Sequence, residues 1–539
     1  MIDGSMQPFS LTLDKFLVHG AKWHDRAEVV TAQPNGGVQR VTYKDLLERA
    51  RRLSALLQNR SIRAGDRVAT LAWNTAAHVE AWYGIVGIGA VCHTLNPRLA
   101  PADIAAMLRQ SQAPILIVSA DLANLAQTVA EAAPDVTSIL IIDGEAAVGS
   151  GGSGIRPETL ERQLGQNDGA LVEWGQFDET APSGLCFTSG TTGAPKGVTY
   201  THRSSYLHTL RLLQADVFAI SARDTILACV PMFHANAWGL PFAAPAVGAR
   251  LVLPGRRADG ESLAKLINQE KVTLAVGVPT VWLGLVEYLE THGGEVPSLQ
   301  RILVGGTALP PALMERIEAR LGVRIQTSWG MTELSPSGTV ADPLADPRDA
   351  ALSGKPAIGL DLLLTDAEGQ PLPDQRNVEG HLRVRGAAVV ERYFGQDTVA
   401  TDADGWFVTG DLARINADGQ LIITGRSKDL IKSGGEWINP AEIEAIVGAL
   451  PQVSLAAVIG CIDLKWGERP LLLVEMRRDE EASDAELLSS LKGRVASWWI
   501  PDRVIRLNSM PRAPTGKIDK MQLRHQYGNA SGWPQGAGS

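Results

Sequence analysis

The sequence predicts an α/β protein with a large N-terminal domain, made of two α/β layers and a β-subdomain, and a small mobile α+β C-terminal domain. Its 539 residues are too many for a single hydrophobic core. Helical and strand patterns alternate over the first two thirds, and a strand-rich stretch begins near Asp361. We expect an N-terminal domain at residues 1–426 with its β-subdomain at about 355–426, a C-terminal domain at 427–527 and a disordered tail at 528–539.

The two α/β layers are predicted from changes in hydrophobic periodicity. Leucines recur at helical spacing across Tyr43–Arg60, which indicates an amphipathic helix. Short apolar runs follow, with strands expected at Val68–Ala72, Ile115–Val118 and Ser138–Ile142. The rhythm returns with strands at Thr225–Val230, Leu274–Val276, Arg301–Val304 and Val323–Thr327 and helices at Ser262–Gln269, Thr280–Leu289 and Pro310–Leu321. Such alternation implies parallel sheets covered on both faces.

In the last third of the sequence, the predicted secondary structure changes twice. Strands separated by Gly, Pro and Asp turns are expected at Asp361–Asp366, Gly380–Arg385 and Gln420–Thr424. After Gly425, a hairpin at Lys428–Gly435 precedes a compact α+β unit, with helices at Pro440–Leu450 and Asp484–Val495 and strands at Leu455–Gly460 and Pro470–Met476.

Composition and charge exclude several classes. The net charge of -9, without a dense Lys/Arg run, argues against a nucleic-acid partner. Four scattered cysteines form no zinc or disulfide pattern and suit a reducing compartment. The most apolar run, Ala81–Cys92, is too short for a membrane span, and residues 1–15 show no secretory signal. We expect a cytoplasmic protein with no membrane span.

A loop rich in glycine and hydroxyl groups is the strongest chemical signal. Residues 188–197 read Thr-Ser-Gly-Thr-Thr-Gly-Ala-Pro-Lys-Gly. Glycines allow close backbone approach to a ligand, and hydroxyls with a lysine supply donors to phosphate oxygens. The string is not a Walker A loop, because Pro195 stands where that loop needs its second glycine and Gly197 follows the lysine. The predicted phosphate-binding residues are Thr188, Ser189, Gly190, Thr191, Thr192, Gly193 and Lys196.

This loop resembles the phosphate-binding signature of the adenylate-forming superfamily, which includes acyl-CoA synthetases, peptide-synthetase adenylation domains and beetle luciferases. Further motifs match in the same order, so the resemblance covers nearly the whole chain. It implies that ATP, Mg²⁺ and coenzyme A act together with a small-molecule carboxylic acid. Relatives are often dimers, so a homodimer is a further expectation.

The resemblance assigns a nucleotide site to two segments that follow expected strands. The first is the adenine-contacting turn, and the second carries an aromatic ring that stacks on adenine, a threonine at the α-phosphate and a magnesium ligand. Trp329 stands where many relatives have tyrosine, and its wider ring can still stack. By resemblance, Glu333 holds magnesium together with Thr188. The two segments comprise Gly305, Gly306, Thr307 and Ala308, then Ser328, Trp329, Gly330, Met331, Thr332 and Glu333.

The same resemblance assigns roles near the expected domain boundary and in the C-terminal domain. Asp411 matches the acceptor of both ribose hydroxyls. Arg426 matches a contact to ribose or phosphate, and Lys428 the hinge. Lys517 matches the catalytic lysine, whose compact cation visits the α-phosphate. The loop implied to line the pantetheine tunnel contains Lys432, Gly434, Gly435 and Trp437.

The acid pocket is implied by residues 230–239, Val-Pro-Met-Phe-His-Ala-Asn-Ala-Trp-Gly. Amino-acid-activating relatives carry an aspartate in this segment, but this chain has none. His234 and Trp238 instead favour an uncharged, apolar substrate tail, and Val278 and Pro279 are expected to line another wall. We count His234 with Lys517, Thr332 and Glu333 as candidate catalytic residues. The sequence of this segment resembles that of short- and medium-chain fatty acyl-CoA ligases and methylmercaptopropionate–CoA ligases.

The resulting hypothesis is an AMP-forming acid–thiol ligase acting on short- or medium-chain fatty acids or a methylthio-alkanoic acid. Two alternatives stay open: an adenylating enzyme that loads a carrier protein, and a non-catalytic acyl or nucleotide sensor. The motifs also do not separate ligation from a luciferase-like oxidation of the adenylate. One methylene changes discrimination by only ~1–3 kcal/mol, so the sequence does not rank similar acids.

Overall fold

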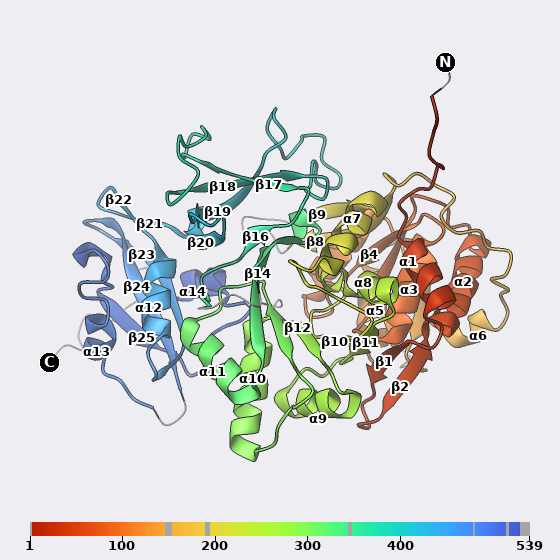
Figure 1. Ribbon diagram of the computed structural model, residues 1–539, viewed down its shortest axis with the longest axis horizontal. Coiled ribbons are helices and arrows are strands. Elements are labelled where there is room, and N and C mark those ends of the chain that lie inside the picture. The colour runs from red at the N-terminus through yellow and green to blue at the C-terminus, as the bar shows by residue number, and fades with distance from the viewer. Residues whose placement is uncertain are drawn as a thin grey trace.

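The computed structural model describes residues 3–145, 154–188, 195–342, 348–477, 480–513 and 517–528. The predicted phosphate-loop residues Ser189, Gly190, Thr191, Thr192 and Gly193 lie outside these ranges, as does the expected tail beyond residue 528. Figure 1 shows a large body, which runs from red through green to cyan, and a small blue C-terminal domain beside it. This confirms the predicted fold class.

The first α/β layer is a seven-stranded sheet with the order β7-β6-β5-β3-β4-β8-β9. Its strands are parallel except β9, which runs antiparallel to β8. The glycine- and hydroxyl-rich string at residues 188–197 begins at the end of β8 and continues into β9. The strands are β3 (Arg67–Leu71), β4 (Val91–Thr94), β5 (Ile115–Ser119), β6 (Ser138–Ile142), β7 (Glu158–Thr159), β8 (Pro182–Thr188) and β9 (Lys196–Thr201).

The second layer is a nine-stranded sheet with the order β16-β15-β14-β13-β12-β10-β11-β1-β2. Its middle six strands are parallel, and an antiparallel hairpin from the start of the chain closes one edge. The strands are β1 (Glu28–Ala32), β2 (Val38–Thr42), β10 (Thr225–Ala228), β11 (Arg250–Leu253), β12 (Leu274–Gly277), β13 (Arg301–Val304), β14 (Arg324–Gly330), β15 (Ser337–Val340) and β16 (Lys355–Pro356).

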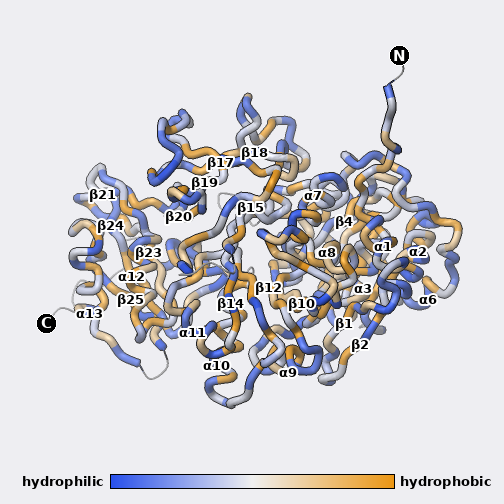
Figure 2. Tube along the Cα trace, viewed as in Figure 1, coloured by the Kyte–Doolittle hydropathy of each residue, from blue (hydrophilic) through white to orange (hydrophobic). Residues whose placement is uncertain are grey.

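Helices cover these sheets, and one of them joins the layers. The residues of α3 are buried almost all round because this helix contacts β1 of one sheet and β3 and β4 of the other. Figure 2 shows hydrophobic strands in the middle of the molecule and hydrophilic segments toward its outside. The helices of the large domain are α1 (Asp14–Trp23), α2 (Tyr43–Asn59), α3 (Ala76–Val86), α4 (Pro101–Ser111), α5 (Ala123–Glu131), α6 (Leu160–Leu164), α7 (His202–Leu213), α8 (Leu240–Val247), α9 (Gly260–Glu270), α10 (Pro279–His292) and α11 (Pro311–Leu321).

Two smaller sheets complete the fold. The β-subdomain is an antiparallel sheet of β17 (Leu360–Thr365), β18 (Glu379–Gly386), β19 (Phe407–Ile415) and β20 (Leu421–Arg426). The C-terminal sheet contains β21 (Ile431–Ser433), β22 (Glu436–Ile438), β23 (Val453–Asp463), β24 (Gly467–Met476) and β25 (Arg503–Arg506). Its helices are α12 (Pro440–Gly448), α13 (Asp484–Ser489) and α14 (Lys520–Tyr527).

The predicted helix at Asp484–Val495 is wrong over its second half, because α13 ends at Ser489. The side chains of Ser489 and Ser490 donate to the carbonyl oxygens of Glu486 and Leu487, so they compete for the helical acceptors. Within the described ranges, no helix is both long enough and apolar enough to cross a bilayer.

Candidate active site

Several of the predicted site residues lie where the carboxyl ends of β12, β13 and β14 meet. These parallel neighbours end at Gly277, Val304 and Gly330, and α/β sheets hold ligands at this edge. Beyond Val304, the Gly305–Gly306 turn has no side chains, and Gly306 has a φ of +83°. The hydroxyl of Ser328 donates to the carbonyl oxygen of Val304 across 3.0 Å, which ties β13 to β14.

Three side chains from distant segments converge on this turn. A Cβ atom added at Gly305 would lie 2.4 Å from Ser328 Oγ and 2.9 Å from Trp238 Cη2. One added at Gly306 would lie 4.0 Å from Lys517 Cε. Because a side chain at Gly305 would collide with Ser328 and Trp238, glycine is required there, and the positive φ of Gly306 favours glycine at the next position.

The other expected wall residues surround the same turn. Val278 Cγ1 would lie 3.4 Å from a Cβ atom at Gly306, and Pro279 begins α10 directly after it. Thr307 and Ala308 follow the turn and are exposed. The structure thus brings the expected acid-pocket wall to the expected adenine turn.

A buried carboxylate lies beside this edge. Asp411 on β19 is 1% exposed, and its Oδ2 accepts a hydrogen bond of 2.9 Å from Trp329 Nε1. Arg426 Nε lies 2.6 Å from Oδ1, because Asp411 and Arg426 face each other across β19 and β20. Burial raises the pKa of Asp411, while Arg426 and Trp329 oppose that shift.

Trp329 is itself buried, with one edge of its indole ring facing Gly338. Its hydrogen bond to Asp411 was not anticipated from the sequence, since the resemblance implied only stacking. The expected magnesium ligand, Glu333, lies in the short helix η3 (Thr332–Leu334) just beyond β14 and is 8% exposed. Tyr393 Oη donates to Glu333 Oε1 across 3.0 Å, and Tyr200 Oη donates to the carbonyl oxygen of Thr332 across 2.9 Å.

Lys517 brings a cation to this group from the far end of the chain. Burial lowers the pKa of its ammonium to about 8, and the nearby positive charges of Arg426 and Lys428 act in the same direction. Asp411 and Glu333 lie close enough to offset part of that shift. An ammonium held beside other cations is suited to an anionic ligand such as a phosphate.

His234 lies at the start of an unusual backbone turn. Burial, with Lys517 adding repulsion, lowers the pKa of His234 to about 4, so its ring is neutral near pH 7. The next four residues, Ala235 to Trp238, all have φ between +45° and +59°, and Gly239 continues the turn at +80°. Left-handed conformations of non-glycine residues cost about 1–3 kcal/mol each, so the surrounding packing must hold this segment in place.

Asn74 is one element of that packing, and sequence reasoning missed it. Its side-chain amide donates to the carbonyl oxygens of Ala228 and Val230, and its Oδ1 accepts from Met232 N at 2.7 Å. The buried asparagine therefore fixes the segment that leads into His234. A single Asn beside Thr75 gives no signal of this role, because its partners are more than 150 positions away.

The two described ends of the expected phosphate loop are paired across β8 and β9. Thr188 lies opposite Lys196 and its hydroxyl donates to the Lys196 carbonyl oxygen across 3.4 Å. Lys196 is exposed, with its Nζ 4.9 Å from the centre of the Tyr393 ring. Within the described ranges no group of three or more His, Cys, Asp or Glu side chains could hold a metal ion, and Glu333 remains the expected carboxylate ligand. Magnesium characteristically binds through one or two carboxylates and substrate phosphates.

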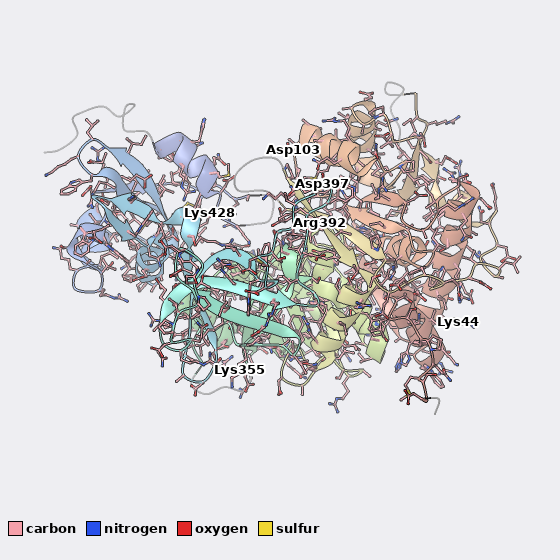
Figure 3. The ribbon with its side chains drawn as sticks, turned by 90° about the horizontal axis from the view of Figure 1, so that it is seen from above. Lys44, Asp103, Lys355, Arg392, Asp397 and Lys428 are labelled. Atoms are coloured by element: carbon pink, nitrogen blue, oxygen red, sulfur yellow. The ribbon has the colours of Figure 1, made fainter. Side chains whose placement is uncertain are left out.

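The expected pantetheine loop lies apart from these residues. It forms the β21–β22 hairpin at the outer edge of the C-terminal domain (Figure 1). Gly434 N donates to the carbonyl oxygen of Trp466 across 2.7 Å, and Trp437 is 54% exposed with Lys432 Nζ 5.4 Å from its ring. Lys428 lies in η4 (Ser427–Asp429), at the junction of the C-terminal domain with the rest of the chain (Figure 3).

Replacement of Trp329 by phenylalanine tests the Asp411 contact. Trp329→Phe keeps an aromatic ring but removes a donor from a buried carboxylate. The free energy of unfolding should fall by about 1–3 kcal/mol. Denaturant unfolding measures the change, and Trp498→Phe at an exposed position is the control. Equal stability of the wild type and Trp329→Phe would contradict the importance of this contact.

The chain is similar to known proteins over nearly its whole length. Residues 16–394 match the family described as "AMP-binding enzyme", and residues 442–517 match the "AMP-binding enzyme C-terminal domain". The chain is 40% identical over 537 residues to a medium-chain-fatty-acid–CoA ligase of Ectopseudomonas oleovorans, with 98% of each chain covered. It is 38% identical over 539 residues to a 3-methylmercaptopropionyl-CoA ligase of Ruegeria lacuscaerulensis, covering 98% of this chain and 99% of the relative.

Solved structures show the same architecture. An anthranilate CoA ligase in complex with anthranoyl-AMP superposes with a TM-score of 0.86 at 24% identity, covering 97% of this chain and 98% of the other. A fatty acyl CoA synthetase of Mycobacterium tuberculosis gives a TM-score of 0.73 at 27% identity, with 96% and 98% covered. The two matched ranges together cover most of the sequence. The chain therefore belongs to the AMP-binding enzyme family.

Proposed function

We propose that this protein is an ATP-dependent carboxylic acid–CoA ligase that forms an acyl-adenylate and releases AMP and pyrophosphate. One observation carries the proposal: Lys517 approaches the side-chain-free Gly305–Gly306 turn on the face where Trp238 also lies. A cation, a backbone turn without side chains and an apolar wall are thus combined. The 40% and 38% identical relatives are named as CoA ligases of a medium-chain fatty acid and of 3-methylmercaptopropionate.

In the first half-reaction, a carboxylate oxygen of the acid attacks the α-phosphorus of ATP, and pyrophosphate leaves. Lys517 stabilises the charge that grows on the α-phosphate, and the neutral His234 helps to orient the acid. Asp411 receives the ribose hydroxyls beside Trp329, and Arg426 adds a contact to ribose or phosphate. Glu333 is the carboxylate that fits Mg²⁺, which when bound offsets the charge of the triphosphate.

In the second half-reaction, the thiol of coenzyme A attacks the acyl carbonyl carbon, and AMP leaves. We propose that the C-terminal domain, residues 427–527, turns about Lys428 relative to residues 1–426 between the two halves. This motion withdraws Lys517 and presents Gly434 and Gly435, which are remote from the adenine turn in the present arrangement. The narrow glycine pair suits the passage of a pantetheine arm.

The acid itself is proposed from the pocket wall. Val278 and Trp238 offer apolar surface at the adenine turn, which suits a short or medium alkyl or thioether tail. The cytoplasm is the proposed location, because four free cysteines suit a reducing compartment.

The direct test measures pyrophosphate and AMP release with Mg²⁺, ATP, coenzyme A and a panel of straight-chain, branched, aromatic and thioether acids. The proposal requires acid-dependent AMP formation and an acyl-CoA product. Adenylation without transfer to coenzyme A, but with transfer to a phosphopantetheinyl carrier protein, would favour the carrier-loading alternative. Binding of nucleotide with no AMP from any acid would favour the sensor.

Lys517→Ala should separate the two half-reactions. Loss of the cation at the α-phosphate should slow adenylate formation by roughly 10²- to 10³-fold, while thioester formation from supplied acyl-adenylate changes much less. Pyrophosphate release and single-turnover transfer measure the two halves. Lys44→Ala, an exposed lysine far from Lys428 in Figure 3, is the control. Equal losses in both halves would refute the division of labour.

The pKa of Lys517 predicts a pH dependence. Since burial lowers this pKa to about 8, the ammonium is charged below pH 8 and loses its charge as the pH rises above it. The kcat/KM for ATP, which reports groups of the free enzyme, should therefore fall above about pH 8. The residual adenylation activity of Lys517→Ala should lack this fall. A wild-type profile that stays flat to pH 10 would contradict the role of the charge.

Trp238→Ala should change the choice of acid. Removal of the indole from the adenine-turn wall enlarges the acyl pocket, so longer or bulkier acids should gain relative to shorter ones. Competition assays measure kcat/KM ratios across chain lengths. Trp23→Ala, at an exposed position, should leave the ratios unchanged. An unaltered profile in Trp238→Ala would assign the ring to the core alone.

A further inference from the structure

The connection between β18 and β19 joins two parts of the site that come from different sheets. Phe394 N donates to the carbonyl oxygen of Gly197 on β9, across 2.8 Å. Val390 N donates to the carbonyl oxygen of Glu333, also across 2.8 Å. The connection, marked by Arg392 and Asp397 in Figure 3, lies in the middle of the molecule. It therefore fixes the start of β9 relative to η3.

Tyr393 lies in the sequence between Val390 and Phe394, which form these two backbone hydrogen bonds. Its side chain contacts the same two parts of the site. Its hydroxyl donates to Glu333 Oε1 across 3.0 Å. The ammonium of Lys196 lies 4.9 Å from the centre of its ring, within the range of a cation–π interaction. One side chain thus contacts the expected magnesium ligand through its hydroxyl and the expected phosphate-loop lysine through its ring.

The Glu333 carboxylate depends on this hydroxyl. Within the described ranges, Tyr393 is its one side-chain hydrogen-bond donor, and no described lysine or arginine forms an ion pair with it. Glu333 is 8% exposed, so the carboxylate has little water to replace a lost partner. The bond engages Oε1 and leaves Oε2 for another ligand. A donor on one carboxylate oxygen is the usual way in which proteins orient a metal ligand.

Lys196 lines two open depressions. A cavity of about 350 Å³ is lined by Gln110, Pro195, Lys196, Phe394, Gly395 and Gln396. A second cavity, of about 320 Å³, has Lys196, Tyr393 and Gln396 among its lining residues. Because the exposed Lys196 borders open space, its flexible stem has several conformations available, and the Tyr393 ring favours one of them.

We propose that Tyr393 is a positioning residue for the magnesium–triphosphate complex: it orients the Glu333 carboxylate through its hydroxyl and holds the Lys196 ammonium over its ring. This inference rests on the proposed function, because it takes Glu333 as the metal ligand and Lys196 as a phosphate ligand. Tyr393 itself touches neither metal nor phosphate. Its effect should appear in metal-dependent binding of a triphosphate and not in binding of AMP.

The test measures binding of a non-hydrolysable ATP analogue by calorimetry over a range of Mg²⁺ concentrations. Tyr393→Phe keeps the ring and removes the hydroxyl, so the Mg²⁺ concentration for half-maximal binding should rise about 10-fold or more. Tyr393→Leu also removes the ring and should weaken triphosphate binding further. Affinity for AMP without Mg²⁺ should stay at the wild-type value in both variants.

Tyr200→Phe is the matched control. Tyr200→Phe also removes a buried tyrosine hydroxyl. That hydroxyl donates to the carbonyl oxygen of Thr332, the residue before Glu333, and not to the Glu333 carboxylate. This substitution should lower the melting temperature without changing the Mg²⁺ requirement. A Tyr200→Phe shift as large as that of Tyr393→Phe would mean that general loosening, not positioning, is the cause.

A double-mutant cycle with Glu333→Gln gives a second measurement. If Tyr393 acts through Glu333, adding Tyr393→Phe to Glu333→Gln should raise the Mg²⁺ requirement no further. Additive effects, or a Tyr393→Phe protein with the wild-type requirement, would overturn the inference. A wild-type protein that binds no triphosphate at any Mg²⁺ concentration would instead refute the proposed function.

Discussion

The close approach of side chains to one bare backbone turn is the constraint on which the site depends. Gly305 and Gly306 continue a buried parallel strand. Ser328 and Trp238 occupy the space that a side chain at Gly305 would need, and Lys517 lies beside Gly306. Each of the three comes from a different part of the chain. In the proposed function, this turn is where the adenylate meets the apolar acyl wall and the Lys517 cation. A larger residue at Gly305 would displace Ser328 and Trp238.

Charge is distributed around that turn in a way that suits an anion. Lys517, Arg426 and Lys428 lie near one another, and each of the two lysines has its pKa lowered by burial and by neighbouring cations. Asp411 and Glu333 compensate only in part, and each is tied to a hydrogen-bond donor, Trp329 or Tyr393. Binding of a nucleotide would relieve the repulsion among the cations. Withdrawal of the C-terminal domain would relieve it as well, because it removes Lys517, so the same electrostatics favour both halves of the proposed cycle.

The acid-pocket segment contains a run of energetically unfavourable backbone conformations. Four consecutive non-glycine residues adopt left-handed conformations just before α8, and Asn74 anchors the strand end that leads into them. This arrangement directs the Trp238 ring across the Gly305–Gly306 turn. The surrounding core therefore holds the wall of the proposed acid pocket in one conformation. If this segment were flexible, the same residues would not form a pocket of defined shape.

The sequence by itself determined the fold class, the family and the order of the motifs, because helical and strand periodicities and glycine-rich strings are local. Most predicted strands agree with the structure to within a few residues, while the helix expected at Asp484–Val495 failed where serine side chains compete for backbone acceptors. Only the tertiary structure decided that Trp329 bonds to Asp411, that Tyr393 links Glu333 with Lys196 and that Asn74 fixes the acid-pocket segment. These partners are dozens to more than a hundred residues apart, and no local pattern encodes which distant groups the packing of two sheets brings within a hydrogen bond of each other.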